Sequence, residues 1–171
     1  MKKLLMLCLV GMAAAAMAAE TPIELKTKKN IIAWGSKKYY ETVNVTVENG
    51  VAKVAVGKTV PDAKPDPYQF GALTKSLKGG VNYKLTFTVK SNANVRLGYT
   101  VLLSQKPWTH IAKKVRRAEL TADTPQTLEV QFTQQEDIAG WVRVPGLSAV
   151  LKEGQTLELS DVKLAEMDAA K

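Results

Sequence analysis

The stretch Val81-Asn82-Tyr83-Lys84-Leu85-Thr86-Phe87-Thr88-Val89-Lys90 decides the fold of this chain. Its odd-numbered residues are apolar and its even-numbered residues are polar, which is the period of an extended strand with one buried face and one solvated face. Rows of the same kind, separated by turn signals, fill the chain between residues 42 and 165. The pattern predicts a β-sheet protein, whose functional residues lie on sheet faces and connecting loops.

Turn signals divide these rows into strands. Asn49-Gly50 supplies the two positive φ angles of a tight hairpin, and the proline-rich segment 60–67 favours a loop that crosses between sheets. At Ser160-Asp161 the apolar row changes parity, which predicts a β-bulge. Strands are predicted at about 31–34, 43–47, 51–56, 68–75, 81–90, 95–103, 115–121, 126–133, 138–144 and 156–164. The fold class predicted is all-β, a single-domain antiparallel β-sandwich of the jelly-roll type.

The segment 108–118 fits two interpretations. Its apolar residues also have helical spacing, with the basic run Lys113-Lys114-x-Arg116-Arg117 on the other side, as in an amphipathic helix. Pro107 and the neighbouring strand signals favour a loop followed by a strand, and we prefer that interpretation.

Residues 1–19 have the pattern of a secretory signal peptide. Lys2 and Lys3 precede the apolar stretch 4–10, and Ala16-Met17-Ala18 is a small-x-small cleavage site. The stretch is too short to span a bilayer and no later one is long enough, so we expect no membrane span and a secreted or periplasmic protein. Cys8, the one cysteine, lies in this segment, so no disulfide is expected in the mature chain.

The domain organisation expected from these signals has four parts. Residues 1–19 are the signal peptide, residues 20–41 an N-terminal segment with a short strand at 31–34, residues 42–165 the β-sandwich, and residues 166–171 a flexible tail.

The chain is basic. Its formal net charge is +8, and it would be +6 without Lys2 and Lys3. An excess of positive charge favours acidic partners such as uronate or sulfate glycans, although many exported proteins are simply basic. Export and the lack of a concentrated stripe of basic and aromatic residues argue against nucleic acid as the partner.

Two stretches resemble a known module. Tyr68-Gln69-Phe70, followed by residues 77–91 with the pattern L-x-x-G-x-x-Y-x-L-x-F-x-x-K-S, is similar to galactose-binding-like jelly rolls, in particular to the carbohydrate-binding modules appended to xylanases and cellulases. The segments 124–132 and 155–164 are similar too, and the resemblance covers about residues 30–165. It implies a jelly roll that binds a polysaccharide or oligosaccharide.

The resemblance also leaves a structural calcium ion open, with no other cofactor expected. Asp161 occupies the position of the closing acidic residue of such modules, whereas the segment 29–34 lacks the carboxylate that their opening segment often supplies. One carboxylate is thin support for an ion that takes six to eight oxygen ligands.

Carbohydrate recognition uses flat apolar side chains against the C–H faces of sugar rings and planar polar side chains that hold hydroxyl groups in pairs. The candidates of these types are Trp34, Tyr39, Tyr40, Tyr68, Gln69, Arg96, Gln105, Trp108, Trp141 and Arg143. Our predicted ligand-binding set comprises Tyr68, Gln69, Arg96, Gln105, Trp108, Trp141 and Arg143. The alternative for each aromatic ring is core packing, and for each polar residue a solvated sheet face.

Position separates these candidates further. Tyr83, Phe87, Tyr99 and Phe132 follow apolar rows and are assigned to the core. Trp108 lies outside any row and is the best candidate for an exposed platform. Trp141 and Arg143 share parity and therefore one face of a strand. The basic run 113–117 could meet sulfate or carboxylate groups on a glycan, or be an ordinary solvated face.

The sequence favours a non-catalytic protein. It has one histidine, His110, and none of the G-x-S-x-G, H-E-x-x-H or P-loop motifs. The main prediction is an exported, monomeric carbohydrate-binding protein. Two alternatives stay open: an exported sandwich that binds a protein or a cell-envelope partner, and a jelly-roll polysaccharide lyase that uses a Tyr, His110 and arginines such as Arg117.

Overall fold

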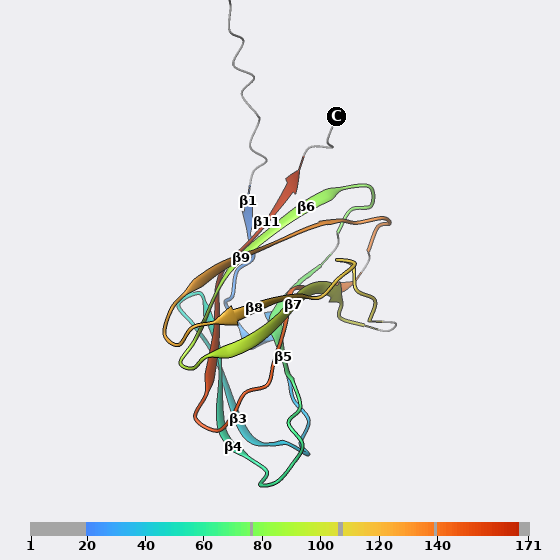
Figure 1. Cartoon of the computed structure of the whole chain (residues 1–171). Helices are drawn as coiled ribbons and strands as arrows, with labels where there is room; N and C mark the ends of the chain where they lie inside the picture. The colour runs from blue at the N-terminus through green and yellow to red at the C-terminus, as the bar shows by residue number, and fades with distance from the viewer. Residues whose placement is uncertain (1–19, 76, 106–107, 139, 168–171) are drawn as a thin grey trace, which may run out of the picture.

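The computed structural model describes residues 20–75, 77–105, 108–138 and 140–167, and these residues form eleven strands in two antiparallel sheets (Figure 1). Sheet A has the order β3-β4-β11-β6-β9, with β1 added beside β11, and sheet B has the order β2-β5-β10-β7-β8. The strands are β1 (Glu20–Pro22), β2 (Ile31–Trp34), β3 (Tyr40–Glu48), β4 (Val51–Thr59), β5 (Tyr68–Lys75), β6 (Asn82–Ser91), β7 (Val95–Leu103), β8 (Arg116–Leu120), β9 (Gln126–Thr133), β10 (Trp141–Ala149) and β11 (Thr156–Met167).

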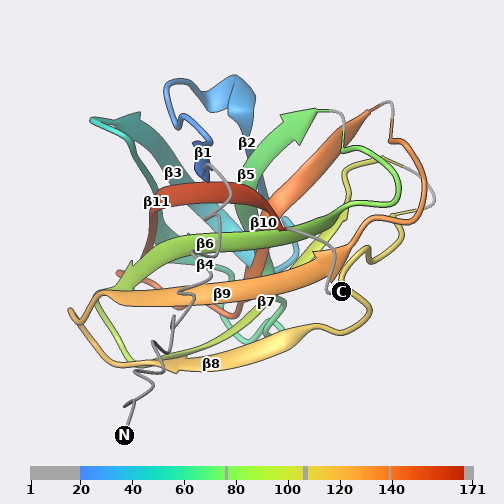
Figure 2. The same ribbon diagram turned by 90° about the horizontal axis from the view of Figure 1, so that it is seen from above.

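The path of the chain confirms the predicted jelly roll. After the β3-β4 hairpin the chain crosses from sheet A to β5 of sheet B through the segment 60–67, and it crosses between the sheets again at each later connection except the one from β7 to β8. In Figure 1, β6 and β9 of sheet A lie above β7 and β8 of sheet B, and Figure 2 shows the same strands from above. Alternation of strands between two packed sheets buries the inner face of each.

The core lies between the inner faces of the two sheets. The odd-numbered residues of β6 are buried, as the alternation predicts, and the ring of Phe87 packs edge-on against Tyr99 of sheet B with the centroids 5.7 Å apart. The four aromatic residues assigned to the core from sequence, Tyr83, Phe87, Tyr99 and Phe132, are all buried.

Two local predictions are confirmed at turns and bulges. Asn49 and Gly50, in the β3-β4 hairpin, have φ angles of 51° and 77°. The register of β11 against β6 shifts between Ser160 and Lys163, and Asp161 has a φ of 50°, which is the predicted β-bulge.

Strand β10 runs from Trp141 to Ala149, whereas the strand predicted there was 138–144. The register with both neighbouring strands shifts between Arg143 and Gly146, so Val144 and Pro145 stand outside the ladder. A proline has no N–H to donate, and a bulge is a place where a central strand tolerates it. The strand therefore continues to Ala149 instead of ending at Val144.

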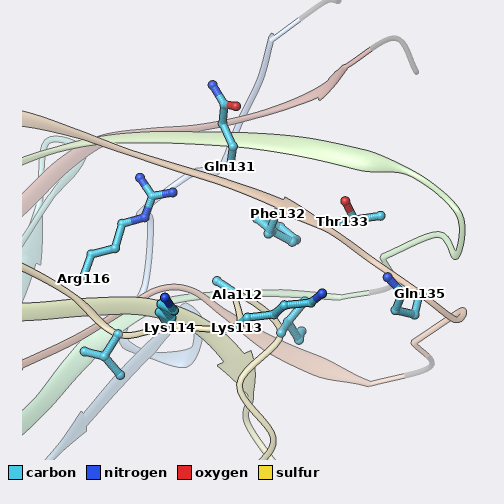
Figure 3. Close-up of a pocket in the computed structure, with 10 residues that line it drawn as sticks. Ala112, Lys113, Lys114, Arg116, Gln131, Phe132, Thr133 and Gln135 are labelled. Atoms are coloured by element: carbon cyan, nitrogen blue, oxygen red, sulfur yellow. The ribbon is translucent and has the colours of Figure 1, made fainter. Parts of the chain in front are cut away.

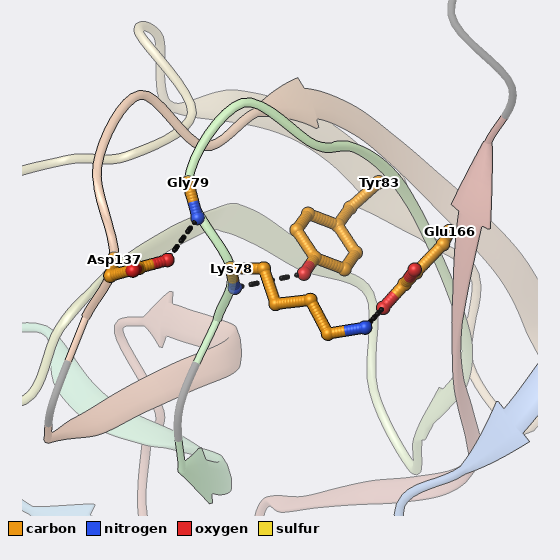
Figure 4. A network of polar contacts seen from close by, with 5 residues as sticks. All are labelled: Lys78, Gly79, Tyr83, Asp137 and Glu166. Atoms are coloured by element: carbon orange, nitrogen blue, oxygen red, sulfur yellow. Dashed lines mark hydrogen bonds and ion pairs between the residues drawn. The ribbon is translucent and has the colours of Figure 1, made fainter.

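Both ends of the described chain belong to the sandwich. β1 and β2, from the segment 20–41, pair with β11 and β5 respectively. β11 extends through Met167, two residues into the predicted tail, and Lys78 Nζ forms an ion pair with Glu166 at 3.0 Å (Figure 4). The predicted signal peptide and residues 168–171 lie outside the described residues.

Helical structure is sparse in the part of the chain that is described. It consists of the 3-10 turn Lys28–Asn30, so no helix there is long and apolar enough to cross a membrane. Residues 108–115 form a loop that leads into β8, so the preferred interpretation of this segment is confirmed and the amphipathic helix is wrong.

Candidate functional site

The outer face of sheet B presents one residue from each of its five strands in a single row. The register of four strand pairings aligns Trp34, Gln69, Ser148, Gly98 and Arg117 in that order across the sheet. Gln69, Gly98 and Ser148 are each flanked along their strands by buried residues, because neighbouring side chains on a strand point to opposite faces. The row therefore lies on the solvent side of the sandwich, and it begins with an aromatic ring and ends with a guanidinium group.

Further rows follow toward the end of the sheet where β10 begins. Gly71 and Gly146 pair opposite each other, and the side chains of Leu102 and Arg143 cover the position of Gly146. The next rows bring together Leu73, Arg143 and Leu102, and then Lys75 and Trp141. The half-buried Arg143 therefore lies between the row of Gln69 and the row of Trp141.

Aromatic side chains are divided sharply between core and surface. All three tryptophans of the chain are exposed, Trp34 by 58%, Trp108 by 47% and Trp141 by 38%, whereas all five tyrosines and all three phenylalanines are buried. Trp34 and Trp141 lie on the outer face of sheet B. They stand opposite Gln69 and Lys75 of β5, which are six residues apart, so about 20 Å along the strand direction separates the two rings.

Trp141 is held in place by a cation. Lys75 Nζ lies 4.7 Å from the centroid of the Trp141 ring, which is a cation–π contact across the β5-β10 pair. A side chain fixed in this way loses less conformational freedom when it contacts a ligand.

Arg143 is a half-buried cation in the middle of this face. Its Nε atom is buried and has no hydrogen-bond partner among the described residues, and burial lowers the pKa of its guanidinium group. A desolvated donor without an acceptor is unfavourable in the free protein. An acceptor group on a bound molecule would relieve that cost.

Gln69 is the other polar side chain in the middle of this face that the sequence predicted. Its Nε2 donates to Ser148 Oγ at 3.3 Å, so the neighbouring strands β5 and β10 orient the amide together. Planar amide and guanidinium groups on one face, as in Gln69 and Arg143, are suited to paired hydrogen bonds with hydroxyl groups.

The remaining predicted residues lie at the margins of sheet B. Arg96 is exposed on the outer face, where its Nε lies 3.4 Å from Oε1 of Glu119 on β8. Gln105 and Trp108 belong to the loop after β7, where the Trp108 N–H donates to the Gln105 carbonyl oxygen at 2.8 Å. The structure thus places Gln69, Arg96, Trp141 and Arg143 on one face, with Gln105 and Trp108 on a loop beside it.

The prediction of Tyr68 as a ligand-binding residue is wrong. Tyr68 is 6% exposed and its ring packs edge-on against Tyr40, with 5.1 Å between centroids. Tyr39 and Tyr40, the other two candidate tyrosines, are buried as well. Because Tyr68 and Gln69 are adjacent on β5, they point to opposite faces, and only one of them can face a ligand.

The face also contains residues that the predicted set lacked. Trp34 was a candidate but was left out of that set, and Gly98, Ser148 and Lys75 had no signal of their own in the sequence. Their place follows from strand pairing, which joins residues far apart in the chain. The parity of Gln69 and Arg143 within their own strands was the signal that the sequence did offer.

Asp161 does not fit a calcium site. Its carboxylate, on the exposed bulge of β11, accepts a hydrogen bond from Ser160 Oγ at 3.1 Å. Within the described ranges no group of three or more Asp, Glu, His or Cys side chains could hold a metal ion. A single exposed carboxylate falls far short of the oxygen ligands that calcium takes.

Solved structures similar to this one include several carbohydrate-binding modules. A carbohydrate-binding module described as CBM4 is 23% identical to this chain with a TM-score of 0.57, and covers 86% of this chain and 95% of its own. The module described as BiXyn10A CBM1 is 15% identical with a TM-score of 0.60, covering 87% and 97%. The N-terminal cellulose-binding domain of Cellulomonas fimi β-1,4-glucanase C is 17% identical with a TM-score of 0.56, covering 88% and 99%.

This chain has the fold of carbohydrate-binding modules. The resemblance predicted from the segments 68–91, 124–132 and 155–164 is confirmed at the level of architecture, along nearly the whole length of the modules compared. No protein-family model and no curated protein sequence matches the chain.

Proposed function

We propose that this protein is an exported, non-catalytic carbohydrate-binding protein that holds a polysaccharide or oligosaccharide on the outer face of sheet B. Export is inferred from the signal-peptide pattern of residues 1–19. The observation that carries the proposal is the exposure of Trp34 and Trp141 on one sheet face, while every tyrosine and phenylalanine is buried. Large apolar rings kept in water on a protein surface are typical of binding sites.

The two rings would stack against the apolar faces of sugar units. About 20 Å along the strand direction separates them, so both can be engaged only by a ligand of several sugar units or by separate ligands. Between the rings, the Gln69 amide and the Arg143 guanidinium would bind hydroxyl groups.

The shared fold adds support. Several structures with TM-scores above 0.5 to this chain are described as carbohydrate-binding or cellulose-binding. Fold alone does not specify function, so the proposal depends on the outer face and its exposed rings.

The lyase alternative is less well supported than binding. A lyase of this kind requires a tyrosine hydroxyl near His110, whereas all five tyrosines are buried. The hydroxyl groups of Tyr40 and Tyr83 form hydrogen bonds with backbone groups. His110 Nδ1 lies 3.4 Å from Thr100 Oγ1, in a loop at the margin of sheet B. We therefore propose that the protein binds its glycan without cleaving it.

A glycan array tests the proposal, with the wild-type protein beside three tryptophan variants. We expect Trp34→Ala and Trp141→Ala each to weaken binding about tenfold or more, since each removes a stacking surface worth roughly 1.4 kcal/mol. Trp108→Ala is the matched comparison, because it removes an equally large exposed ring from the loop beside the face. Binding of no glycan, or wild-type binding by both face variants, would overturn the proposal.

A further inference from the structure

A pocket lies at one edge of the sandwich, where β8 of sheet B and β9 of sheet A run side by side (Figure 2). This edge pocket has a volume of about 530 Å³. It is lined by the loop before β8 and by the end of β9 and the residues after it, as Figure 3 shows. Its lining residues are Ile111, Ala112, Lys113, Lys114, Val115, Arg116, Gln131, Phe132, Thr133 and Gln135.

The two edge strands are joined by side chains and not by a backbone ladder. Arg116 Nη1 donates to the Glu129 carbonyl oxygen at 3.1 Å, and Gln126 Nε2 donates to the Glu119 carbonyl oxygen at 3.1 Å. The first of these hydrogen bonds holds the Arg116 guanidinium at one end of the pocket, which Lys113 and Lys114 also line. The buried ring of Phe132 forms part of the wall.

The charge of the edge pocket is not balanced. Three cations line it, Lys113, Lys114 and Arg116, and the lining contains no Asp or Glu. Elsewhere seven cations form ion pairs, but none of the ion pairs in the described ranges includes these three. Three like charges gathered in one hollow repel one another, and a bound anion would lower that cost.

Lys113 also lines the adjoining pocket, which contains Glu136 and Asp137. The carboxylate of Glu129, whose backbone carbonyl accepts from Arg116, is already occupied. Its Oε2 pairs with Lys84 Nζ at 2.9 Å and its Oε1 accepts from Gln131 Nε2 at 2.7 Å. These two donors lower the pKa of Glu129 below its ordinary value. The carboxylate therefore remains ionised and bound to its own partners on sheet A.

Strand β8 lies between the pocket and the outer face, because neighbouring side chains on a strand point to opposite faces. Arg117 ends the row that begins at Trp34, and Arg116, its neighbour on the strand, lines the edge pocket. Val115, which also lines the pocket, reaches to 3.4 Å from the position that a Cβ on Gly98 would occupy. A chain lying along the row would thus pass over β8 into the basic hollow.

We propose that the edge pocket binds the acidic groups, carboxylate or sulfate, of a charged polysaccharide whose sugar rings lie on the outer face of sheet B. The inference rests on the proposed function and names the class of glycan. Ammonium and guanidinium groups from Lys113, Lys114 and Arg116 would each donate charge-assisted hydrogen bonds to an oxyanion, and the amide of Gln135 would add a neutral one.

Calorimetric titration with matched polymers tests this inference. The ligands are hydroxyethyl, carboxymethyl and sulfated cellulose, together with methyl-esterified and free polygalacturonate, so that charge changes on a constant backbone. We expect at least one charged polymer to bind about tenfold or more tightly than its neutral parent. This difference in affinity should shrink as the salt concentration rises from about 0.05 to about 0.5 M, because dissolved ions screen the charges over roughly this range. Comparison of carboxymethyl with sulfated polymer identifies the acidic group.

Two triple variants separate a specific pocket from general positive charge. Lys113→Gln/Lys114→Gln/Arg116→Gln should remove the advantage of the charged polymer and leave binding of the neutral parent within about twofold. The control Lys29→Gln/Lys64→Gln/Lys152→Gln removes the same charge from exposed lysines outside the pocket and should keep the advantage.

Failure of this inference differs from failure of the proposed function. Equal affinity for charged and neutral polymers, or an equal loss of affinity for the charged polymer in both triple variants, would overturn the proposed role of the edge pocket. Wild-type affinity in a Trp34→Ala/Trp141→Ala variant, with the charge dependence intact, would overturn the role of the outer face instead.

Discussion

Trp34 and Arg117 stand at opposite ends of one row of residues across sheet B, on its two edge strands β2 and β8. Gln69, Ser148 and Gly98 connect them, one from each strand between. The row joins a stacking surface to a cation through a stretch of small and polar residues. This arrangement suits a ligand that lies across the strands and ends near the basic edge of the sandwich.

Gly98 is the position in this row where a side chain would obstruct a ligand without disturbing the fold. A Cβ placed there would lie 3.4 Å from Val115 Cγ1 and 3.5 Å from the Ser148 carbonyl oxygen, which are near-ordinary contacts. We expect Gly98→Leu to weaken glycan binding at least tenfold and to leave the melting temperature within a few degrees, as for other surface changes. Calorimetric titration and thermal melting measure the two effects. Gly71→Ala is the contrasting variant, because its Cβ would clash with the Pro145 carbonyl oxygen and the fold should be destabilised.

Arg143 should matter for binding more than for stability. Its buried Nε has no acceptor among the described residues, so replacement by an apolar side chain removes an unfavourable group from the free protein. We expect Arg143→Met to keep or raise the free energy of unfolding, measured in urea, and to weaken glycan binding about tenfold. A loss of stability larger than about 1 kcal/mol would show that the guanidinium has a structural partner.

Tyr40 should contribute to stability through its hydroxyl group. The hydroxyl donates to the Asp66 carbonyl oxygen at 2.7 Å and accepts from the Leu151 N–H at 3.2 Å, which joins the segment before β5 to the one after β10. We expect Tyr40→Phe to lower the free energy of unfolding by about 1–3 kcal/mol, since two backbone groups lose their partner. Tyr68→Phe is the control, because the Tyr68 hydroxyl forms no hydrogen bond within the described ranges. Equal effects of the two substitutions would contradict this account.

Stability should fall at alkaline pH. Burial raises the pKa of Tyr40 and of Tyr68 above the ordinary value of 10.0. Because the unfolded chain then releases its phenolic protons at lower pH than the folded one, stability is constant below about pH 10 and decreases as the pH rises above it. Urea titrations at pH 8 to 11 measure this slope. A double variant, Tyr40→Phe/Tyr68→Phe, should show a shallower decline, and an unchanged slope would exclude these two residues as its source.

Lys78 forms a hydrogen bond to a buried side chain and an ion pair on the surface, so their contributions to stability can be compared (Figure 4). The Lys78 N–H donates to the hydroxyl of the buried Tyr83 at 3.0 Å, whereas Lys78 Nζ pairs with Glu166 on the surface. We expect Tyr83→Phe to lower the free energy of unfolding by about 1 kcal/mol and Glu166→Gln to lower it by less, because exposed ion pairs contribute little. Urea denaturation of both variants tests the order, and a larger loss for Glu166→Gln would reverse it.

Much of the sandwich could be predicted because strand alternation is a local property. The boundaries of β5, predicted at 68–75, and of β2, predicted at 31–34, agree with the structure, as does the bulge at Asp161. The predicted strand 138–144 stopped short of Ala149, and the continuation through Pro145 depends on a bulge in the pairing with both neighbours. That pairing is not visible from the strand itself.

The sequence by itself determined which residues share a face within each strand, since neighbouring side chains on extended backbone must point in opposite directions. That rule placed Trp141 with Arg143, and it would have separated Tyr68 from Gln69 had it been applied there. Only the tertiary structure decided that Trp34, Gln69 and Arg117 belong to one row, because strand register and the order of strands in a sheet arise from contacts between distant parts of the chain. The same contacts decided that the tryptophans face solvent while the tyrosines fill the core.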